Sequence, residues 1–391
     1  MMRSFLILIM AIACGVTVAN LYYNQPLLAL LANEFHASAN DVSFIPTLTQ
    51  IGYALGILLL VPMGDLVERR RLIVLMLALT AIALVLAALS PNLTWLVIAS
   101  FAIGMTAIAA QIIVPFAAQL AEPQERGKAV GTVMSGLLIG ILLARTVSGF
   151  VGITWGWRSM YWLASGLMVV LAIVMVNVLP HSQPSLKISY GHLMRSLTQL
   201  VQEQPRLQQA SLIGAMSFGA FSAFWSTLAF LLEQPPYHYG SDVTGLFGLV
   251  GVVGAAAAPV VGKIADRHSP RLTVGLGIAT TAFSFVLFWL LGYQIWGLVI
   301  GVILLDLGVQ TTQISNQTSI YRLPTEIHSR LNALYIMFYF IGGAFGSFLG
   351  AYGWSHWRWS GVCLLSLGLL AIAAAAFLKS RRDRRTSDSR V

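Results

Sequence analysis

Long apolar blocks, each about as long as a helix that crosses a lipid bilayer, recur along almost the whole chain. A spanning helix needs about 20 mostly apolar residues. Such blocks lie at residues 5–31, 42–63, 72–90, 94–120, 129–152, 159–180, 207–232, 242–262, 272–291, 295–320, 331–352 and 360–378. The run Leu72–Leu79 does not alternate in polarity, as a strand of a membrane β-barrel would. The sequence therefore predicts an all-α membrane protein with twelve transmembrane helices.

The composition excludes an ordinary soluble domain. Charged residues make up 9% of the 391 residues and hydrophobic residues 57%, and the mean hydropathy is +0.79. Soluble domains carry about 25% charged residues, which keep exposed apolar patches small. Lipid is the solvent that suits this chain, and we expect a multi-pass protein of the bacterial inner membrane.

The distribution of Lys and Arg predicts the orientation. If the N-terminus is cytoplasmic, 20 of the 23 basic residues fall in cytoplasmic segments, whereas Arg158 and Arg358 lie outside and Arg145 lies in the membrane. Such a bias is typical of cytoplasmic loops and places both termini in the cytoplasm. The net charge of +9 is then a signal of topology, and we expect no nucleic-acid partner.

Several chemistries find no support in the sequence. No Gly-rich phosphate loop that ends in Lys-Ser/Thr is present, and no two of the seven His residues form an H-x-x-x-H pair. Cys14 and Cys363 lie in opposite terminal helices, and they indicate neither a disulfide nor a metal site. The apolar N-terminus is expected to be an uncleaved first helix. We expect no catalytic residues, no metal, no cofactor and no enzymatic activity.

Three short motifs of the first half return in the second half after 200 to 204 residues. The matching pairs are Asp65 with Asp266, Arg126 with Arg330, and Trp157–Arg158 with Trp357–Arg358. Six helices per copy, with both ends on one side, make the copies parallel repeats. The predicted parts are two six-helix halves (1–180 and 207–378), a cytoplasmic linker (181–206) and a basic tail (379–391).

The loops that contain Asp65 and Asp266 resemble the G-x-L-A-D-R-x-G-R-K signature of the major facilitator superfamily. The second loop keeps Gly262, Ala265, Asp266, Arg267 and Arg271, whereas the first keeps Asp65, Arg69 and Arg70. The resemblance covers the whole chain and implies a two-half transporter that works by alternating access. The nearest subgroup resembles the bacterial drug:proton antiporters, from which the chain departs at Ser100, Ile141, Ala144 and Arg145.

The loop motif also has a chemistry of its own. An Asp beside a helix end can form charge-assisted hydrogen bonds with an Arg two to five residues further on. We expect such a network to hold the cytoplasmic sides of the two halves together and to break on inward opening. The alternative is a simple anchor that fixes topology. The gating candidates are Asp65, Arg69, Arg70, Gly262, Asp266, Arg267 and Arg271.

Two charges lie deep within the apolar blocks, Arg145 and Asp306. Each costs about 2.5–3.5 kcal/mol to place at the centre of a membrane helix, so each is a candidate functional residue. Asp306 could carry a proton, because burial favours the neutral carboxyl; it could bind a cationic solute; or it could be a static partner of Arg145. With Gln310, Gln313 and Gln317 it forms a single polar stripe along a helix.

The remaining cavity candidates depend on the family resemblance, which implies that the first, fourth, seventh and tenth helices line the central cavity. They are Asn20, Tyr23, Asn24, Gln111 and Trp225, together with Gln310 and Gln313. Amide and phenol groups suit hydrogen bonding and stacking with a solute. The alternative is ordinary hydrogen bonding between helices.

Regularly spaced glycines predict close helix contacts. They are Gly136 and Gly140, then Gly342, Gly346 and Gly350, and also Gly245, Gly248, Gly251 and Gly254. Such spacing lets two backbones approach. We expect these glycines to form the surfaces on which the two halves rock.

Taken together, these features predict a secondary active transporter that exports a small organic solute in exchange for protons. Proton-coupled or facilitated uptake of a sugar or another metabolite is the alternative, and a membrane sensor or enzyme is less favoured. The expected partners are the solute and the bilayer, the energy source is the proton gradient, and the expected oligomeric state is a monomer.

Overall fold

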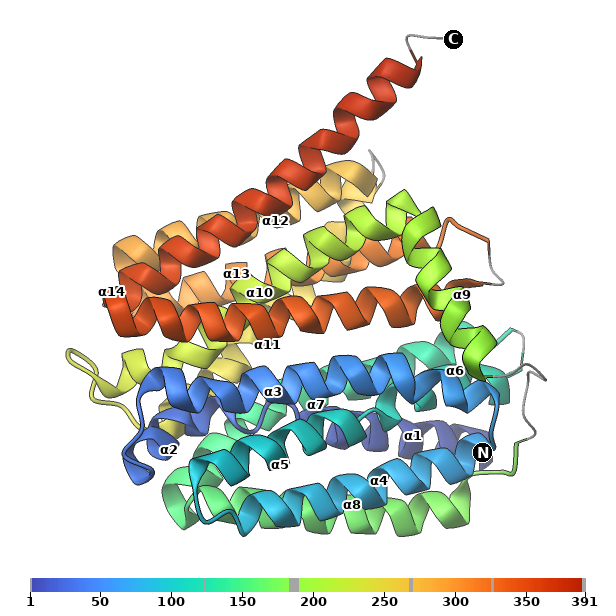
Figure 1. The fold of residues 1–391 in the computed structure, drawn as a ribbon, viewed down its shortest axis with the longest axis horizontal. Coiled ribbons are helices and arrows are strands. Elements are labelled where there is room, and N and C mark those ends of the chain that lie inside the picture. Colours follow the sequence, from blue (N-terminus) through green and yellow to red (C-terminus); the bar gives the residue numbers. More distant parts are fainter. Residues whose placement is uncertain (1, 123, 183–189, 267–269, 325–326, 389–391) are drawn as a thin grey trace. The chain divides into compact units, whose positions relative to one another are not determined.

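The structure is a computed structural model that describes residues 2–122, 124–182, 190–266, 270–324 and 327–388. Side chains are described except at residues 2–4, 65, 257–266, 270–271 and 380–388, where the description covers the backbone. Within the described ranges the regular elements are all helices, as Figure 1 shows, and no residue is in a strand. The prediction of an all-α chain is confirmed.

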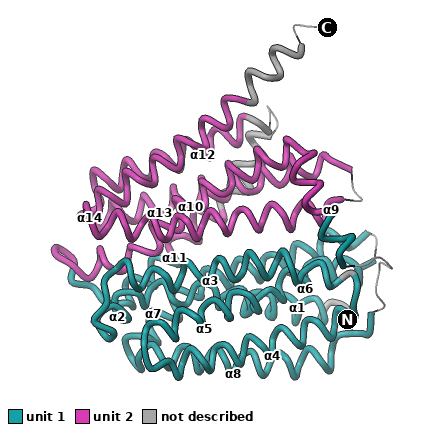
Figure 2. The backbone as a smooth tube through the Cα atoms, in the orientation of Figure 1, with its two compact units in different colours: residues 1–195, 238–249 teal, residues 196–237, 250–391 magenta. Residues whose placement is uncertain are grey.

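The helices are α1 (Met2–Ala19), η1 (Gln25–Leu27), α2 (Leu28–Glu34), α3 (Ala39–Leu59), η2 (Val61–Asp65), α4 (Arg69–Ala88), α5 (Leu93–Thr106), α6 (Ala109–Leu120), α7 (Arg126–Trp155), α8 (Trp157–Val178), α9 (Tyr190–Glu203), α10 (Pro205–Glu233), α11 (Ser241–Asp266), α12 (Pro270–Leu291), α13 (Ile295–Ile320) and α14 (His328–Asp388). They form two compact units, shown in Figure 2. Unit 1 holds residues 1–195 and 238–249, and unit 2 holds residues 196–237 and 250–391. The first turns of α11 therefore belong to unit 1.

Most of the described helices have the length and composition of membrane spans. Nine helices in the described part of the chain are long and apolar enough to cross a bilayer, and Phe5–Ala19 and Ser241–Ala256 are shorter apolar helices. Large apolar side chains are exposed along them, for example Ile98 on α5 and Leu290 on α12. Exposure of such side chains is stable in lipid. The count of twelve crossings and the position of the termini stay predictions.

Some of the predicted continuous segments are interrupted, and one long helix contains a kink between two predicted segments. The segment 5–31 leaves the helix at residues 20–24, just before Pro26 at the start of η1, and the segment 94–120 is broken at residues 107–108. Proline lacks the amide hydrogen that a continuous helix needs, so a regular helix cannot run through Pro26. In α14, Trp357 and Arg358 have non-helical backbone angles and separate two helices that together run from His328 to Asp388.

Glycines bring helix backbones together inside each unit. In unit 1, Gly136 and Gly140 of α7 face Ala11 and Gly15 of α1. In unit 2, Gly342 and Gly346 of α14 face Ala215 and Gly219 of α10 in the same way. The two sets of contacts are related by shifts of 204 and 206 residues, which supports the internal repeat.

These contacts correct one prediction. Gly136, Gly140, Gly342, Gly346 and Gly350 pack against helices of their own unit and are not surfaces between the halves. The spacing of small residues identifies a helix face that approaches another backbone, but it does not identify the helix that covers this face.

The closest of these contacts predicts a clear loss of stability. Gly346→Ala is expected to lower the free energy of unfolding by about 1–3 kcal/mol, because the new methyl group would overlap the backbone of Gly219. The measurement is thermal unfolding in detergent. Gly368→Ala, in the second helix of α14, is the control, since its methyl group would meet no atom within 4 Å. Equal melting temperatures for the two variants would contradict the tight packing of α10 and α14.

Candidate functional site

The buried guanidinium of Arg145 organises the polar groups of unit 1. Arg145 lies on α7 and is 1% exposed, and its Nε donates a hydrogen bond to Oε1 of Gln25 at 2.7 Å. Its Cζ lies 4.8 Å from the ring centroid of Tyr22, a cation–π contact. Tyr22 lies within the break between α1 and η1, and Gln25 directly follows it. The irregular backbone thus places an amide and an aromatic ring beside a charge that bare lipid would not tolerate.

The break itself is held by α7. Ser148, three residues after Arg145, donates a hydrogen bond from its hydroxyl to the carbonyl oxygen of Tyr23 at 2.5 Å. A carbonyl freed from helical bonding is therefore satisfied inside the protein, as a membrane interior requires. Tyr23 is a predicted cavity residue, and it is buried.

Two other predicted cavity residues of unit 1 approach the same face of α3. Asn24 donates from Nδ2 to Oγ1 of Thr49 at 3.4 Å, and Gln111 of α6 donates from Nε2 to the hydroxyl of Tyr53 at 3.0 Å. Thr49 and Tyr53 are four residues apart and share one side of the helix. Asn24 and Gln111 are thus brought together along α3.

The side chain of Asn20 contacts other helices than those of Asn24 and Gln111. Its Nδ2 donates to the carbonyl oxygens of Thr17 and Val16 and reaches Sδ of Met168 on α8 at 3.5 Å. In both Asn20 and Asn24 the buried Oδ1 accepts no hydrogen bond from the described residues. A buried acceptor in this condition is costly, so each is suited to receive a donor from a solute or a water molecule.

In unit 2, the carboxyl group of Asp306 packs against the backbone of α11. Asp306 is 3% exposed, and a methyl group added at Gly251 would lie 2.9 Å from its Oδ2. One turn further on, Gly254 faces the carbonyl of Ile303 on α13. Glycine at these positions leaves the room that the carboxyl group and the close helix contact need.

The amides that follow Asp306 along α13 face the first part of α14. Gln313 accepts a hydrogen bond from the hydroxyl of Tyr339 at 3.3 Å, and Gln317 donates from Nε2 to Oδ1 of Asn332 at 3.3 Å. Gln310 and Gln313 are only half-buried. The predicted polar stripe therefore continues onto a neighbouring helix and stays partly accessible.

Aromatic side chains of α10 complete this surface. Phe218 stacks on Tyr339 with ring centroids 4.0 Å apart and an interplanar angle of 17°. Further along α10, Trp225 is 1% exposed and packs against Phe221 and Phe224. Phe218 and Tyr339 are thus next to the polar stripe, whereas the predicted cavity residue Trp225 lies within the packed aromatic core of unit 2.

Helix α11 borders each intramembrane charge in its own unit. In unit 1, a methyl group added at Gly248 would lie 3.0 Å from Cβ of Arg145. In unit 2, a methyl group added at Gly251 would lie 2.9 Å from Oδ2 of Asp306. The pairing of Arg145 with Asp306 stays a prediction, because the two residues belong to different units.

The predicted gating motif is described in part. Arg69 donates from Nε to the carbonyl oxygen of Gly64 at 3.0 Å and from Nη1 to Oε1 of Gln119 at 2.8 Å. It therefore joins the loop after α3 to the end of α6 within unit 1. The side chain of Asp65 is outside the described part of the structure. The same holds for the side chains at the gating positions of the second loop, which are Gly262, Asp266, Arg267 and Arg271. A role in holding the halves together stays a prediction.

The neighbouring residues of the first loop form a network that the sequence analysis missed. His181 contacts Arg70 through Nε2 at 3.0 Å and Glu68 through Nδ1 at 2.7 Å. Glu68 also forms an ion pair with Arg71 at 2.9 Å. Through these hydrogen bonds, Arg69 and Arg70 join the loop to other helix ends of the same unit.

A second missed cluster joins loops at the opposite end of unit 1. Glu34 accepts hydrogen bonds from Trp157 Nε1 at 2.5 Å and from Arg158 Nη1, and Arg158 also donates to the carbonyl oxygen of Ser90 at 3.2 Å. Burial raises the pKa of Glu34, but the hydrogen bonds from Arg158 and Trp157 and the positive charge of Arg158 together hold that pKa below its usual value. The sequence showed Trp157 and Arg158 only as repeated residues.

This lowered pKa predicts a pH dependence. A carboxyl group whose pKa is lower in the folded state stabilises the fold above its unfolded pKa, and this contribution is lost as the pH falls through the folded value. Glu34→Gln is expected to lower the melting temperature at neutral pH by a small amount, because an exposed ion pair contributes about 1 kcal/mol or less. The difference between variant and wild type should shrink below about pH 4. A constant difference from pH 3 to pH 7 would contradict this role of Glu34.

Other polar residues of the apolar blocks are partners of the candidate residues. Gln25, Tyr53 and Tyr339 each form a hydrogen bond with a candidate residue. Polar side chains within apolar blocks were the available signal. Among the described residues, no three His, Cys, Asp or Glu side chains are grouped as metal ligands.

Comparison with known proteins gives the family. The sequence matches the Major Facilitator Superfamily over residues 7–326 and 210–391. The transporter YgaY of Escherichia coli K12 is 44% identical over 92% of this chain and 91% of its own length. A transporter of Streptomyces coelicolor, SCO4007, is 32% identical over 96% of this chain and 87% of its own length.

A solved structure has the same fold. The inward-facing, unoccupied bacterial homologue of the human lysosomal transporter Spinster has a TM-score of 0.79 at 15% identity, with 97% of each chain covered. At this identity the likeness concerns the fold alone. The family consists of membrane transporters and not of enzymes, which agrees with the sequence prediction. This chain belongs to the Major Facilitator Superfamily and is a membrane transporter of a small solute.

Proposed function

We propose that this transporter exports a small organic solute and is driven by protons that move inward. The observation that supports this most is the buried carboxyl group of Asp306, next to a half-buried stripe of amides on the same helix. Stability alone gives no reason for a carboxyl group at this depth, since apolar residues would be less costly there. It can bind and release a proton beside groups that hydrogen-bond a solute.

The chemistry of the surrounding residues supports a neutral or cationic solute that is partly aromatic. Gln310 and Gln313 offer both donors and acceptors, and Phe218 and Tyr339 offer aromatic faces. In unit 1, the acceptor oxygens of Asn20 and Asn24 are open to a donor. These groups bind by hydrogen bonds and stacking and carry no net charge of their own.

The proposed topology has twelve crossings, with both termini in the cytoplasm of a bacterial cell and the protein in the inner membrane. The interrupted segments 5–31 and 94–120 each count as one crossing, and α14 counts as two crossings joined at Trp357 and Arg358. The proposed halves are 1–180 and 207–378. The excess of Lys and Arg in the loops assigned to the cytoplasm supports this orientation.

Transport in membrane vesicles of both orientations tests the proposal. Everted vesicles with an acid interior are challenged with a panel of dyes, drugs, sugars and amino acids, and release of protons is followed with a pH-sensitive fluorophore. We expect at least one compound to dissipate the gradient only when the transporter is present. A compound that is accumulated only by right-side-out vesicles would contradict export and support uptake instead.

A further inference from the structure

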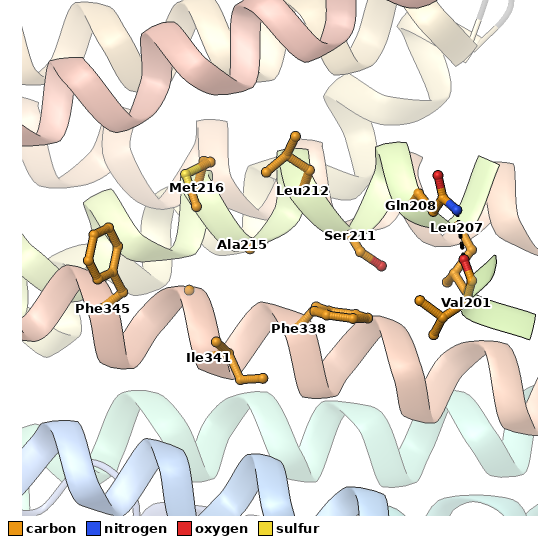
Figure 3. Close-up of a pocket in the computed structure, with 11 residues that line it drawn as sticks. Val201, Leu207, Gln208, Ser211, Leu212, Ala215, Met216, Phe338, Ile341 and Phe345 are labelled. Atoms are coloured by element: carbon orange, nitrogen blue, oxygen red, sulfur yellow. Dashed lines mark hydrogen bonds between the residues drawn. The ribbon is translucent and has the colours of Figure 1, made fainter. Parts of the chain in front are cut away.

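An apolar pocket lies in unit 2, and its lining includes neither Asp306 nor the amides that follow it on α13. It has a volume of about 370 Å³ and is lined by Val201, Leu207, Gln208, Ser211, Leu212, Ala215, Met216, Phe338, Ile341, Gly342 and Phe345. Figure 3 shows these side chains on facing stretches of α10 and α14, with Val201 near the corner between α9 and α10. Its size falls within the range of about 300–1,000 Å³ that is usual for small-molecule sites.

The pocket has one polar feature that calls for a partner. Ser211 is only 3% exposed, and its hydroxyl forms no hydrogen bond with the described residues. In Figure 3 its oxygen points into the space between the two helices. A buried hydroxyl without a partner costs about 1–3 kcal/mol, so a ligand with an acceptor oxygen would relieve a real deficit.

An exposed apolar face adjoins the pocket. Ile341, Phe345 and Phe348 are exposed at spacings of four and three residues, which places them on one face of α14. Leu212 of α10 is exposed beside them. In a membrane-spanning helix such a face contacts acyl chains, so an acyl chain can enter the pocket without crossing water.

The N-terminus of α10, directly before the pocket residues Leu207 and Gln208, carries a positive charge. Arg206 is exposed in the first turn of α10, between the pocket residues Val201 and Leu207 in the sequence. The N-cap residue Gln204 gives this helix no side-chain hydrogen bond, so the amide groups of the first turn are not capped by it. A cationic side chain together with uncapped helix amides binds anions. Glu203 nearby is engaged by Gln199 at 2.7 Å.

We propose that this pocket binds one anionic phospholipid, with an acyl chain in the groove along α10 and α14, an ester oxygen at Ser211 and the phosphate at Arg206. Binding of this lipid braces α10 against α14. The site is separate from the transported solute, and it does not depend on the direction of transport or on the coupling ion.

Native mass spectrometry of the full chain in detergent, titrated with dioleoyl phosphatidylglycerol, tests the proposal. Ser211→Leu fills the pocket and is expected to weaken binding of the first lipid about tenfold or more. Leu212→Trp provides a second test if Ser211→Leu does not fold. Leu290→Trp, on an exposed position of α12 outside the pocket, is the control and should bind like wild type. Wild-type affinity in both pocket variants would overturn the proposal.

Two further measurements separate the parts of the site. Arg206→Gln should weaken binding of phosphatidylglycerol about tenfold but leave binding of dioleoylglycerol, which has no phosphate, unchanged. Phosphatidylglycerol with a photoreactive acyl chain should label peptides that contain residues 201–216 and 338–345. Labelling spread evenly over all exposed helices would show that only bulk lipid binds, and unchanged affinity in Arg206→Gln would overturn the assignment of the phosphate.

Discussion

Asp306→Asn is expected to abolish proton-driven accumulation of the solute. A gradient of 2 pH units stores about 2.7 kcal/mol per proton, which supports about 100-fold accumulation for one proton per solute. Asparagine keeps the size and the hydrogen bonding of the side chain but cannot release a proton. The variant should therefore bring its solute only to equal concentrations on the two sides. The measurement is the ratio of solute inside to solute outside everted vesicles at a fixed gradient.

Exchange without a gradient distinguishes a proton carrier from a binding residue. If Asp306 carries the proton, Asp306→Asn should still exchange labelled for unlabelled solute at a rate near that of wild type. If Asp306 binds a cationic group of the solute, exchange is lost together with accumulation. Asp242→Asn changes another carboxyl group, in the first turn of α11, and is the matched control at equal expression. Full accumulation by Asp306→Asn would show that Asp306 is a structural residue.

The helices of this fold could be predicted from hydropathy because the bilayer imposes a single length and polarity on every span. The breaks were harder to predict. Residues 20–24 leave the helix well before Pro26, and this is stable because Ser148 of α7 binds the carbonyl of Tyr23. A partner that lies 125 residues away decides the local conformation, and no local pattern contains this information.

The candidate site shows the same limit. Arg145 and Asp306 were predictable as single residues, since a charge within an apolar block is costly wherever it points. Their surroundings were not predictable, because Gln25 is 120 residues from Arg145 and Tyr53 is 58 residues from Gln111. The family resemblance placed Trp225 with the cavity residues; in the structure it packs against Phe221 and Phe224, and its role in the cavity stays a prediction. A residue's type indicates its chemistry, but packing decides whether a solute can reach it.

The reversed charge pair Arg145→Asp with Asp306→Arg is expected to regain part of the insertion and transport that each single variant loses. Each single change leaves two like charges within the membrane, and breaking a buried ion pair costs about 3–5 kcal/mol. If the residues pair, the double variant restores one charge of each sign. The measurements are the yield of folded protein in the membrane and the initial rate of solute exchange, each compared with both single variants.

Recovery in the double variant should be incomplete, and the reason lies in the surroundings of Arg145. Gln25 presents an acceptor oxygen and Tyr22 an aromatic face, both suited to a guanidinium and not to a carboxylate. Gln25 can rotate its amide to donate a hydrogen bond instead, whereas the face of the Tyr22 ring stays negative and cannot attract a carboxylate. Combining the reversed pair with Tyr22→Leu should therefore raise recovery further. If the double variant is no better than the worse single variant, with and without Tyr22→Leu, then Arg145 and Asp306 act separately, and proton binding at Asp306 must reach the rest of the transporter by another route.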